Sequence, residues 1–96
     1  MDKIKPKEKE HEQIKEVITD IDVEAKVVVH NDDWHTFDEV IRQLVRAIHC
    51  SPKRAEAFAF EIHNKGRATV FEGSMENCLL VSAVLEEIDL LTTIEA

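Results

Sequence analysis

The pattern of apolar and polar positions divides the 96-residue chain into a charged opening segment and a regular remainder. Regularity starts with residues 25–29, which contain the consecutive valines Val27, Val28 and Val29. A run of β-branched side chains is typical of a buried strand. Asn31, Asp32 and Asp33 follow, and such residues favour local hydrogen bonds to the backbone over a strand ladder. We therefore predict a buried strand that ends in a polar turn.

A helix is predicted to begin at Thr36. Thr36 and Glu39 form the T-x-x-E pattern of a capping box, in which each side chain bonds the backbone N–H of the other residue. Apolar residues then recur at spacings of three, four and seven, which places them on one helical face. They are Phe37, Val40, Ile41, Leu44, Val45 and Ile48.

A second helix is predicted from the pair Ser51 and Pro52. Serine is a favourable N-cap, and proline fits the first helical turn because its missing N–H has no partner there anyway. The inner stripe of this helix is Ala55, Phe58, Ala59 and Ile62. Gly66 can adopt the left-handed conformation that ends a helix, so we place the end of this helix at residues 64–66.

The remaining pattern predicts a strand at residues 67–71, a third helix after Gly73 and Ser74, and a final strand at residues 90–94. One face of the third helix would carry Met75, Cys78, Leu79, Ser82 and Leu85. The order β-α-α-β-α-β predicts a single-domain α+β sandwich, with three helices on one face of a three-stranded, mainly antiparallel sheet.

Residues 1–23 have a different composition, with lysine and glutamate alternating and few sizeable apolar side chains. Such a segment buries too little apolar surface to offset the entropy of ordering it. We expect a mostly disordered, charged tail at residues 1–23 and a folded domain at residues 24–96.

The net charge of −8 argues against nucleic acid as a partner, because a phosphate backbone would be repelled. The two cysteines, Cys50 and Cys78, lack the spacing of a paired motif and are expected to be reduced thiols. No apolar run approaches the roughly 20 residues that span a bilayer, and residues 1–22 do not read as a signal peptide. We expect a cytoplasmic protein that does not enter a membrane.

Candidate chemistry is concentrated in the turn after the first strand. Asn31 and Asp32 supply an amide oxygen and a carboxylate beside an apolar helix, and His63 follows Ile62 at the end of the second helix. These acceptors suit an α-ammonium group, which has three donors and no acceptor. Neighbouring apolar groups could then hold the first side chain of the same ligand.

Simpler interpretations are open for each of these residues. The polar turn is also a common way to start a helix, and His63 is also a favourable surface residue near a helix end. Trp34 could bind a ligand or merely cover the turn. His30, Asp32, His35 and His63 match no zinc spacing, and nothing supplies a nucleophile, an oxyanion hole or a phosphate loop. We therefore expect neither a metal, a cofactor nor an enzymatic activity.

Two segments resemble the signatures of the Clp protease adaptor family ClpS. Residues 27–44 read VVVHNDDWHTFDEVIRQL, and residues 58–70 read FAFEIHNKGRATV. The first resembles the family's Asn-Asp-Asp turn and following helix. The second resembles a helix ending in an aliphatic residue, His, two variable residues, Gly, a basic residue and Ala. The resemblance covers about residues 25–95.

The resemblance implies a monomeric adaptor of the N-end rule. Such adaptors hold clients that begin with Leu, Phe, Tyr or Trp and deliver them to the AAA+ unfoldase ClpA, with the charged tail engaging the unfoldase. By position, the α-amino group would be held by Asn31, Asp32 and His63. The side-chain pocket would be walled by Phe37, Val40, Ile62 and Leu90, with Asp33 and His35 at its rim.

The sequence departs from the family pattern at three places, and these departures affect what we expect of the pocket and of the partner. Ala59 stands where many relatives have Met, which implies a roomier pocket that accepts Ile or Val. His35 stands where many relatives have Thr. Residues 79–81 (Leu-Leu-Val) lack the basic residue that many relatives present to the unfoldase, although Glu76 remains as a partner contact, so a ClpC-type unfoldase is an alternative to ClpA.

A second hypothesis from a different class is a protein–protein assembly module. The ribosomal stalk C-terminal domain shares this general architecture. Such a module would bind a protein factor through a helix face and would need no N-degron pocket.

Overall fold

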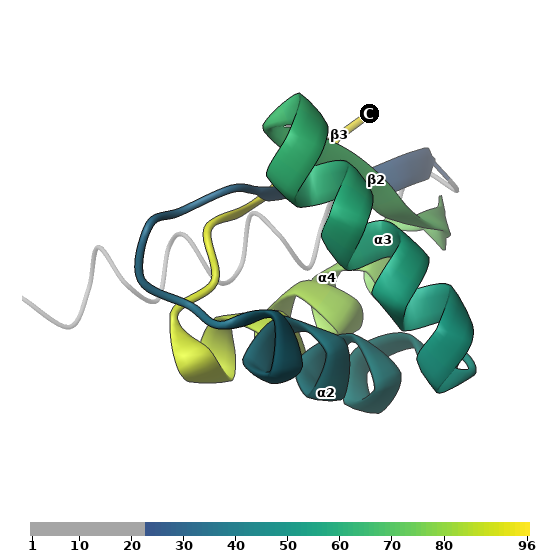
Figure 1. Ribbon diagram of the computed structural model, residues 1–96. Helices are drawn as coiled ribbons and strands as arrows, with labels where there is room; N and C mark the ends of the chain where they lie inside the picture. The colour runs from purple at the N-terminus through teal and green to yellow at the C-terminus, as the bar shows by residue number, and fades with distance from the viewer. Residues whose placement is uncertain (1–22) are drawn as a thin grey trace, which may run out of the picture.

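A computed structural model describes residues 23–96, and nearly all of the predicted tail lies outside these described residues. The elements run β1 (Glu24–His30), α2 (Phe37–Ile48), α3 (Pro52–Lys65), β2 (Arg67–Ser74), α4 (Met75–Leu85), the 3₁₀ helix η1 (Glu86–Ile88) and β3 (Thr92–Glu95) (Figure 1). The predicted order of strands and helices is confirmed. The boundary between residues 23 and 24 stays a prediction.

The three strands form one sheet in the order β2-β1-β3, and both pairings are antiparallel. The hydrogen bonds at the end of β1 fix where the following loop starts. The His30 N–H donates to the Leu91 carbonyl and the Asn31 N–H donates to the Gly66 carbonyl, each at 2.9 Å. Because β1 is the central strand, the loop at residues 31–35 is held from both sides.

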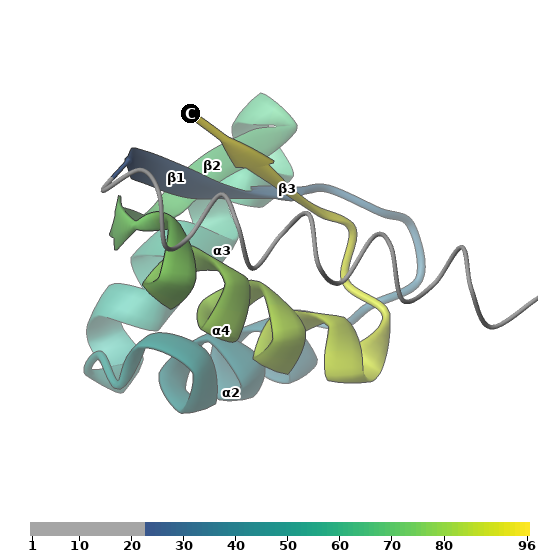
Figure 2. The same cartoon turned by 180° about the vertical axis from the view of Figure 1, so that it is seen from behind.

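The helices α2, α3 and α4 lie together on one face of the sheet (Figure 2). Alternation along β1 turns Val27 and Val29 toward this helical layer, where both are fully buried. Leu44 of α2 and Leu85 of α4 complete the centre of the core with no exposed surface. The α+β sandwich predicted from the sequence is the observed architecture.

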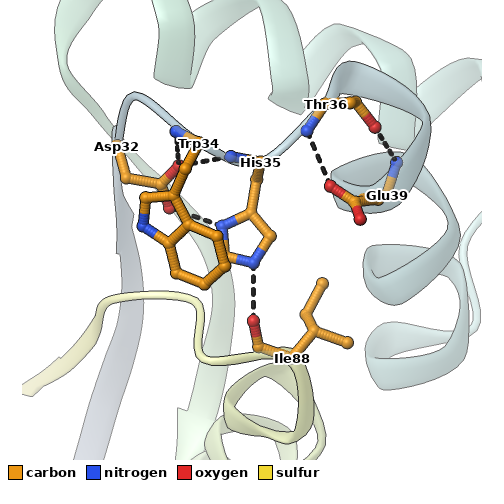
Figure 3. Close-up of polar contacts among 6 residues, drawn as sticks. All are labelled: Asp32, Trp34, His35, Thr36, Glu39 and Ile88. Carbon is orange, nitrogen blue, oxygen red and sulfur yellow. Dashed lines mark hydrogen bonds and ion pairs between the residues drawn. The ribbon is translucent and has the colours of Figure 1, made fainter.

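The predicted helix boundaries follow from local hydrogen bonds. The Thr36 N–H donates to Glu39 Oε1 at 2.8 Å, and the Glu39 N–H donates to Thr36 Oγ1 at 3.2 Å, which closes the capping box of α2 (Figure 3). Ser51 Oγ accepts the Arg54 N–H at 3.1 Å and caps α3. Gly66 ends α3 with a φ of 88°, in the left-handed region.

Several boundaries of the strands differ from the predicted ones. Strand β2 continues to Ser74, and β3 begins at Thr92 because η1 and the left-handed Asp89 (φ 61°) come first. Leu90 therefore lies in a connection, where its side chain is buried.

Side chains of two helices also differ from the predicted faces. In α4, Val81 is buried and Leu79 is only half-buried. In α2, Gln43 is buried because its amide donates to the Val84 carbonyl at 2.6 Å. Within residues 23–96, no helix combines the length and apolar composition needed to cross a bilayer.

Candidate functional site

A cavity of about 290 Å³ opens beside the end of β1, between the loop at residues 31–35, α2 and α3. All ten residues predicted for the site lie around it, together with two neighbours that were not predicted. The lining consists of Val29, His30, Asn31, Asp32, Asp33, His35, Phe37, Val40, Ala59, Ile62, His63 and Leu90. The structure thus brings the predicted residues together, whereas their role in binding stays a prediction.

The floor of the cavity is apolar. Val29, Val40, Ala59, Ile62 and Leu90 line it, and each is at most 9% exposed. They come from β1, α2, α3 and the connection before β3, so the hollow is built into the core of the domain. A side chain entering this space would leave water for an apolar environment.

The mouth of the cavity is polar and open to solvent. Asn31, Asp33 and His63 line it and are exposed. The backbone bond from Asn31 to Gly66 ties the loop to the end of α3, which carries His63 in its last turn. That bond explains why two motifs far apart in the sequence face the same opening.

The carboxylate of Asp32 is turned onto its own loop (Figure 3). Its Oδ1 accepts the backbone N–H groups of Trp34 at 3.1 Å and His35 at 2.9 Å, and its Oδ2 lies 2.6 Å from Nδ1 of the His35 ring. Burial alone would raise the pKa of Asp32, but the hydrogen bonds from His35 and Trp34 outweigh it and lower this pKa below 3.8. Of about four lone-pair positions on an ionised carboxylate, about one remains free for a ligand.

The side chain of His35 lies in the wall of the cavity, deeper than the rim position that the resemblance implied. It is 3% exposed, and its Nε2 lies 2.5 Å from the carbonyl oxygen of Ile88. The exposed indole of Trp34 covers the imidazole, with ring centroids 3.8 Å apart. Trp34 therefore covers the turn and is not part of the cavity lining.

An apolar hollow with oxygen and nitrogen acceptors at its mouth suits a cation attached to an apolar group. Among residues 23–96, no three His, Cys, Asp or Glu side chains are grouped so that they could hold a metal ion. Val29 and His30 were missed as lining residues, although the strand pattern and the adjacent polar turn placed them directly before the site.

The family model of the ATP-dependent Clp protease adaptor protein ClpS matches residues 20–89. The chain belongs to the ClpS family. The match spans β1 through η1 and thus both sequence motifs, which confirms the resemblance to adaptors of the N-end rule.

Solved structures and curated proteins extend this result. The chain resembles ClpS2 of Agrobacterium tumefaciens, with a TM-score of 0.73 and 18% identity over 78% of this chain and 98% of that one. It is 33% identical over 58 residues to the human E3 ubiquitin-protein ligase UBR2, and 35% identical over 66 residues to Drosophila melanogaster UBR1. These matches cover 60% and 69% of this chain but only 3% and 4% of those ligases.

One predicted residue of this ClpS-family chain lies apart from the cavity. Glu76 is exposed in the first turn of α4, and it does not line the cavity. Glu76 was predicted to contact a partner protein and not the ligand. Its position on a surface separate from the cavity is compatible with that prediction.

Proposed function

We propose that this ClpS-family protein is an adaptor that binds N-terminal degrons and delivers the clients to a Clp AAA+ unfoldase. An N-degron here is a free α-amino group followed by a bulky hydrophobic first residue. The observation that carries the proposal is the cavity itself, with its buried apolar floor and its acceptors at the mouth.

Each part of the ligand has a matching group in the cavity. The ammonium would donate to the Asn31 amide oxygen, the free lone pair of Asp32 and a neutral ring nitrogen of His63. Asp33 would add a second negative charge at the mouth. The first side chain would fill the apolar hollow, whose 290 Å³ is near the lower end of small-molecule sites and thus fits one side chain and a chain end.

The expected affinity is moderate. Burial of a leucine or phenylalanine side chain contributes about 1.5–3 kcal/mol, and each charge-assisted hydrogen bond about 1.5–3 kcal/mol. One buried side chain and three charge-assisted hydrogen bonds contribute about 6–12 kcal/mol together, and association costs at least about 4 kcal/mol, so we expect a dissociation constant of about 1 μM or weaker. An adaptor that must release its client requires an affinity of this order.

The comparisons support the ligand class. The similar ClpS2 structure from Agrobacterium holds L-phenylalaninamide, which combines a free amine with an aromatic side chain. We propose that the cavity of this chain binds the same two features.

Delivery would use a surface other than the cavity. Glu76 and the 62%-exposed Leu80 lie four positions apart on α4 and therefore share a helical face. We propose this face as the contact with an unfoldase of the ClpA or ClpC type in the cytoplasm, assisted by the charged segment at residues 1–23.

The test of the proposal is titration with a short peptide that begins with Phe, compared with the same peptide after N-acetylation. We expect micromolar binding of the free peptide and a loss of about 100-fold or more on acetylation, because the charge and its donors are removed together. The His63→Ala variant should bind more weakly, whereas His49→Asn, which removes an exposed histidine away from the cavity, should not change affinity. Equal binding of both peptides would refute the proposal and favour an assembly module.

A further inference from the structure

The ring of His35 is held between two groups that accept hydrogen bonds (Figure 3). Nδ1 lies 2.6 Å from Oδ2 of Asp32, and Nε2 lies 2.5 Å from the carbonyl oxygen of Ile88. Neither an ionised carboxylate nor a carbonyl oxygen has a proton to give. Both contacts are hydrogen bonds only if both ring nitrogens carry protons, whereas a neutral imidazole has one donor.

The surroundings of the ring stabilise a positive charge. A buried charge is costly unless it is paired and hydrogen-bonded, and His35 has a carboxylate, a carbonyl and the face of the Trp34 indole as neighbours. Glu39 at the start of α2 adds an attractive field. Other titratable groups at this end of the domain are His30, Asp33 and His63, which line the cavity, and Glu86, Glu87 and Asp89, which lie in or directly after η1.

The balance of these effects favours the protonated ring. Burial alone would lower the pKa of His35, but the hydrogen bonds to Asp32 and Ile88 and the charges of Asp32 and Glu39 outweigh it. The pKa of His35 is therefore raised above 6.5, while that of Asp32 is lowered. The two shifts agree with an imidazolium–carboxylate pair.

We propose that His35 is a positively charged positioning residue that clamps the loop at residues 31–35 to the end of η1. On one side the clamp orients the Asp32 carboxylate, which also accepts the two backbone N–H groups of the loop. On the other side it holds Ile88, two residues before Leu90 in the floor of the cavity. The clamp is a property of the free protein; only its effect on ligand binding rests on the proposed function.

The protonation state can be read directly in the wild-type protein. Nitrogen NMR of the histidine rings at about pH 7 should show protons on both Nδ1 and Nε2 of His35. A bare ring nitrogen at this pH would overturn the proposal. This measurement requires neither a ligand nor a variant.

The clamp itself is tested with His35→Gln, which is neutral and can donate to only one of the two acceptors. Amide hydrogen exchange of Trp34 and His35 reports the order of the loop, because both N–H groups bond Asp32. We expect exchange at these positions to accelerate about tenfold or more in His35→Gln and to stay unchanged in His49→Asn. Unchanged exchange in a folded His35→Gln protein would refute the clamp.

The sign of the affinity change separates positioning from simple electrostatics. Removal of a positive charge near a site for a cation should by itself strengthen binding of a Phe-initiated peptide. Loss of positioning should weaken binding, and we expect the affinity of His35→Gln for the peptide to be lower by a factor of about ten or more. Tighter or unchanged binding would contradict a positioning role. If the wild type fails to bind the peptide, the proposed function fails, and the NMR and exchange results still decide whether the clamp exists.

Discussion

The ring of Phe37 stands edge-on to the imidazole of His63, with centroids 5.6 Å apart and planes at 77°. Phe37 begins α2 and His63 lies in the last turn of α3, so this contact joins two helices across the mouth of the cavity. A second edge contact, from Phe37 to Phe60, has centroids 5.1 Å apart. Phe37 is therefore the aromatic wall between the apolar floor and the polar mouth.

Replacement of Phe37 by Ala should weaken binding of a Phe-initiated peptide. Loss of an aromatic wall forfeits about 1.5–3 kcal/mol of apolar contact, or about 10- to 100-fold in affinity. Phe60→Ala is the matched control, because Phe60 touches Phe37 but does not line the cavity. Calorimetric titration of both variants should show the larger loss for Phe37→Ala; equal losses would argue against a pocket at this place.

Ala59 should set which first residues are accepted. It is 3% exposed and lines the cavity, so a longer side chain at this position would reduce the volume of the cavity. We expect the wild type to bind Ile-initiated peptides within about tenfold of Leu-initiated ones, since one misplaced methyl group costs about 1 kcal/mol. Ala59→Met should increase this discrimination. A wild type that binds Ile over about 100-fold more weakly than Leu would contradict the expectation.

The N-cap residues Thr36 and Ser51 provide a matched pair. Each caps a helix with one side-chain oxygen, so Thr36→Ala and Ser51→Ala should each lower the free energy of unfolding by about 1 kcal/mol. Only Thr36 joins the loop at residues 31–35 to α2. Urea denaturation should therefore give similar losses, whereas peptide affinity should fall only for Thr36→Ala.

The pair of Asp32 and His35 should make stability depend on pH in two windows. The contribution of His35, whose folded pKa is raised, is complete below about pH 6.5 and is lost as the pH rises through the folded value. The contribution of Asp32, whose folded pKa is lowered, is complete above about pH 3.8 and is lost as the pH falls through the folded value. The denaturant concentration at the midpoint of unfolding should therefore decrease as the pH rises above about 6.5 in the wild type. The same rise in pH should change this midpoint less in His35→Gln.

Glu76 should affect delivery and not recognition. Charge reversal by Glu76→Lys on the exposed start of α4 should slow degradation of a Phe-initiated client by a reconstituted Clp protease, while affinity for the isolated peptide stays unchanged. Glu56→Lys, on the exposed face of α3, is the control for added charge. Impaired degradation by both variants alike would argue against a specific α4 contact.

Local signals in the sequence were sufficient to place the starts of α2 and α3 and the end of α3. The capping box at Thr36, the Ser51-Pro52 start and the Gly66 end act within a few residues, and each is formed in the structure. The family motifs also located the lining of the cavity, where the bond from the Asn31 N–H to the Gly66 carbonyl joins the loop of the first motif to the end of α3 in the second.

Long-range contacts account for what was not predicted. The bond from His35 to Ile88 joins positions 53 residues apart, and no local pattern encodes it. Gln43 is buried through a bond to Val84, 41 residues away, although its polarity places it on a surface. The start of β3 also differs from the prediction, because η1 precedes it. Leu90 lines the floor of the cavity and does not pair in the sheet.

The two backbone bonds at the end of β1 also determine how a load would travel through the domain. Under the proposed function, a client drawn out of the cavity would pull on the loop at residues 31–35, which follows the middle strand and has one backbone bond to each flanking chain segment. We therefore expect tension on the loop to be divided between both sides of the sheet, without separating an edge strand first. If the protein acts as the proposed adaptor, the client should be released before the domain unfolds, and one molecule could then serve many clients in turn.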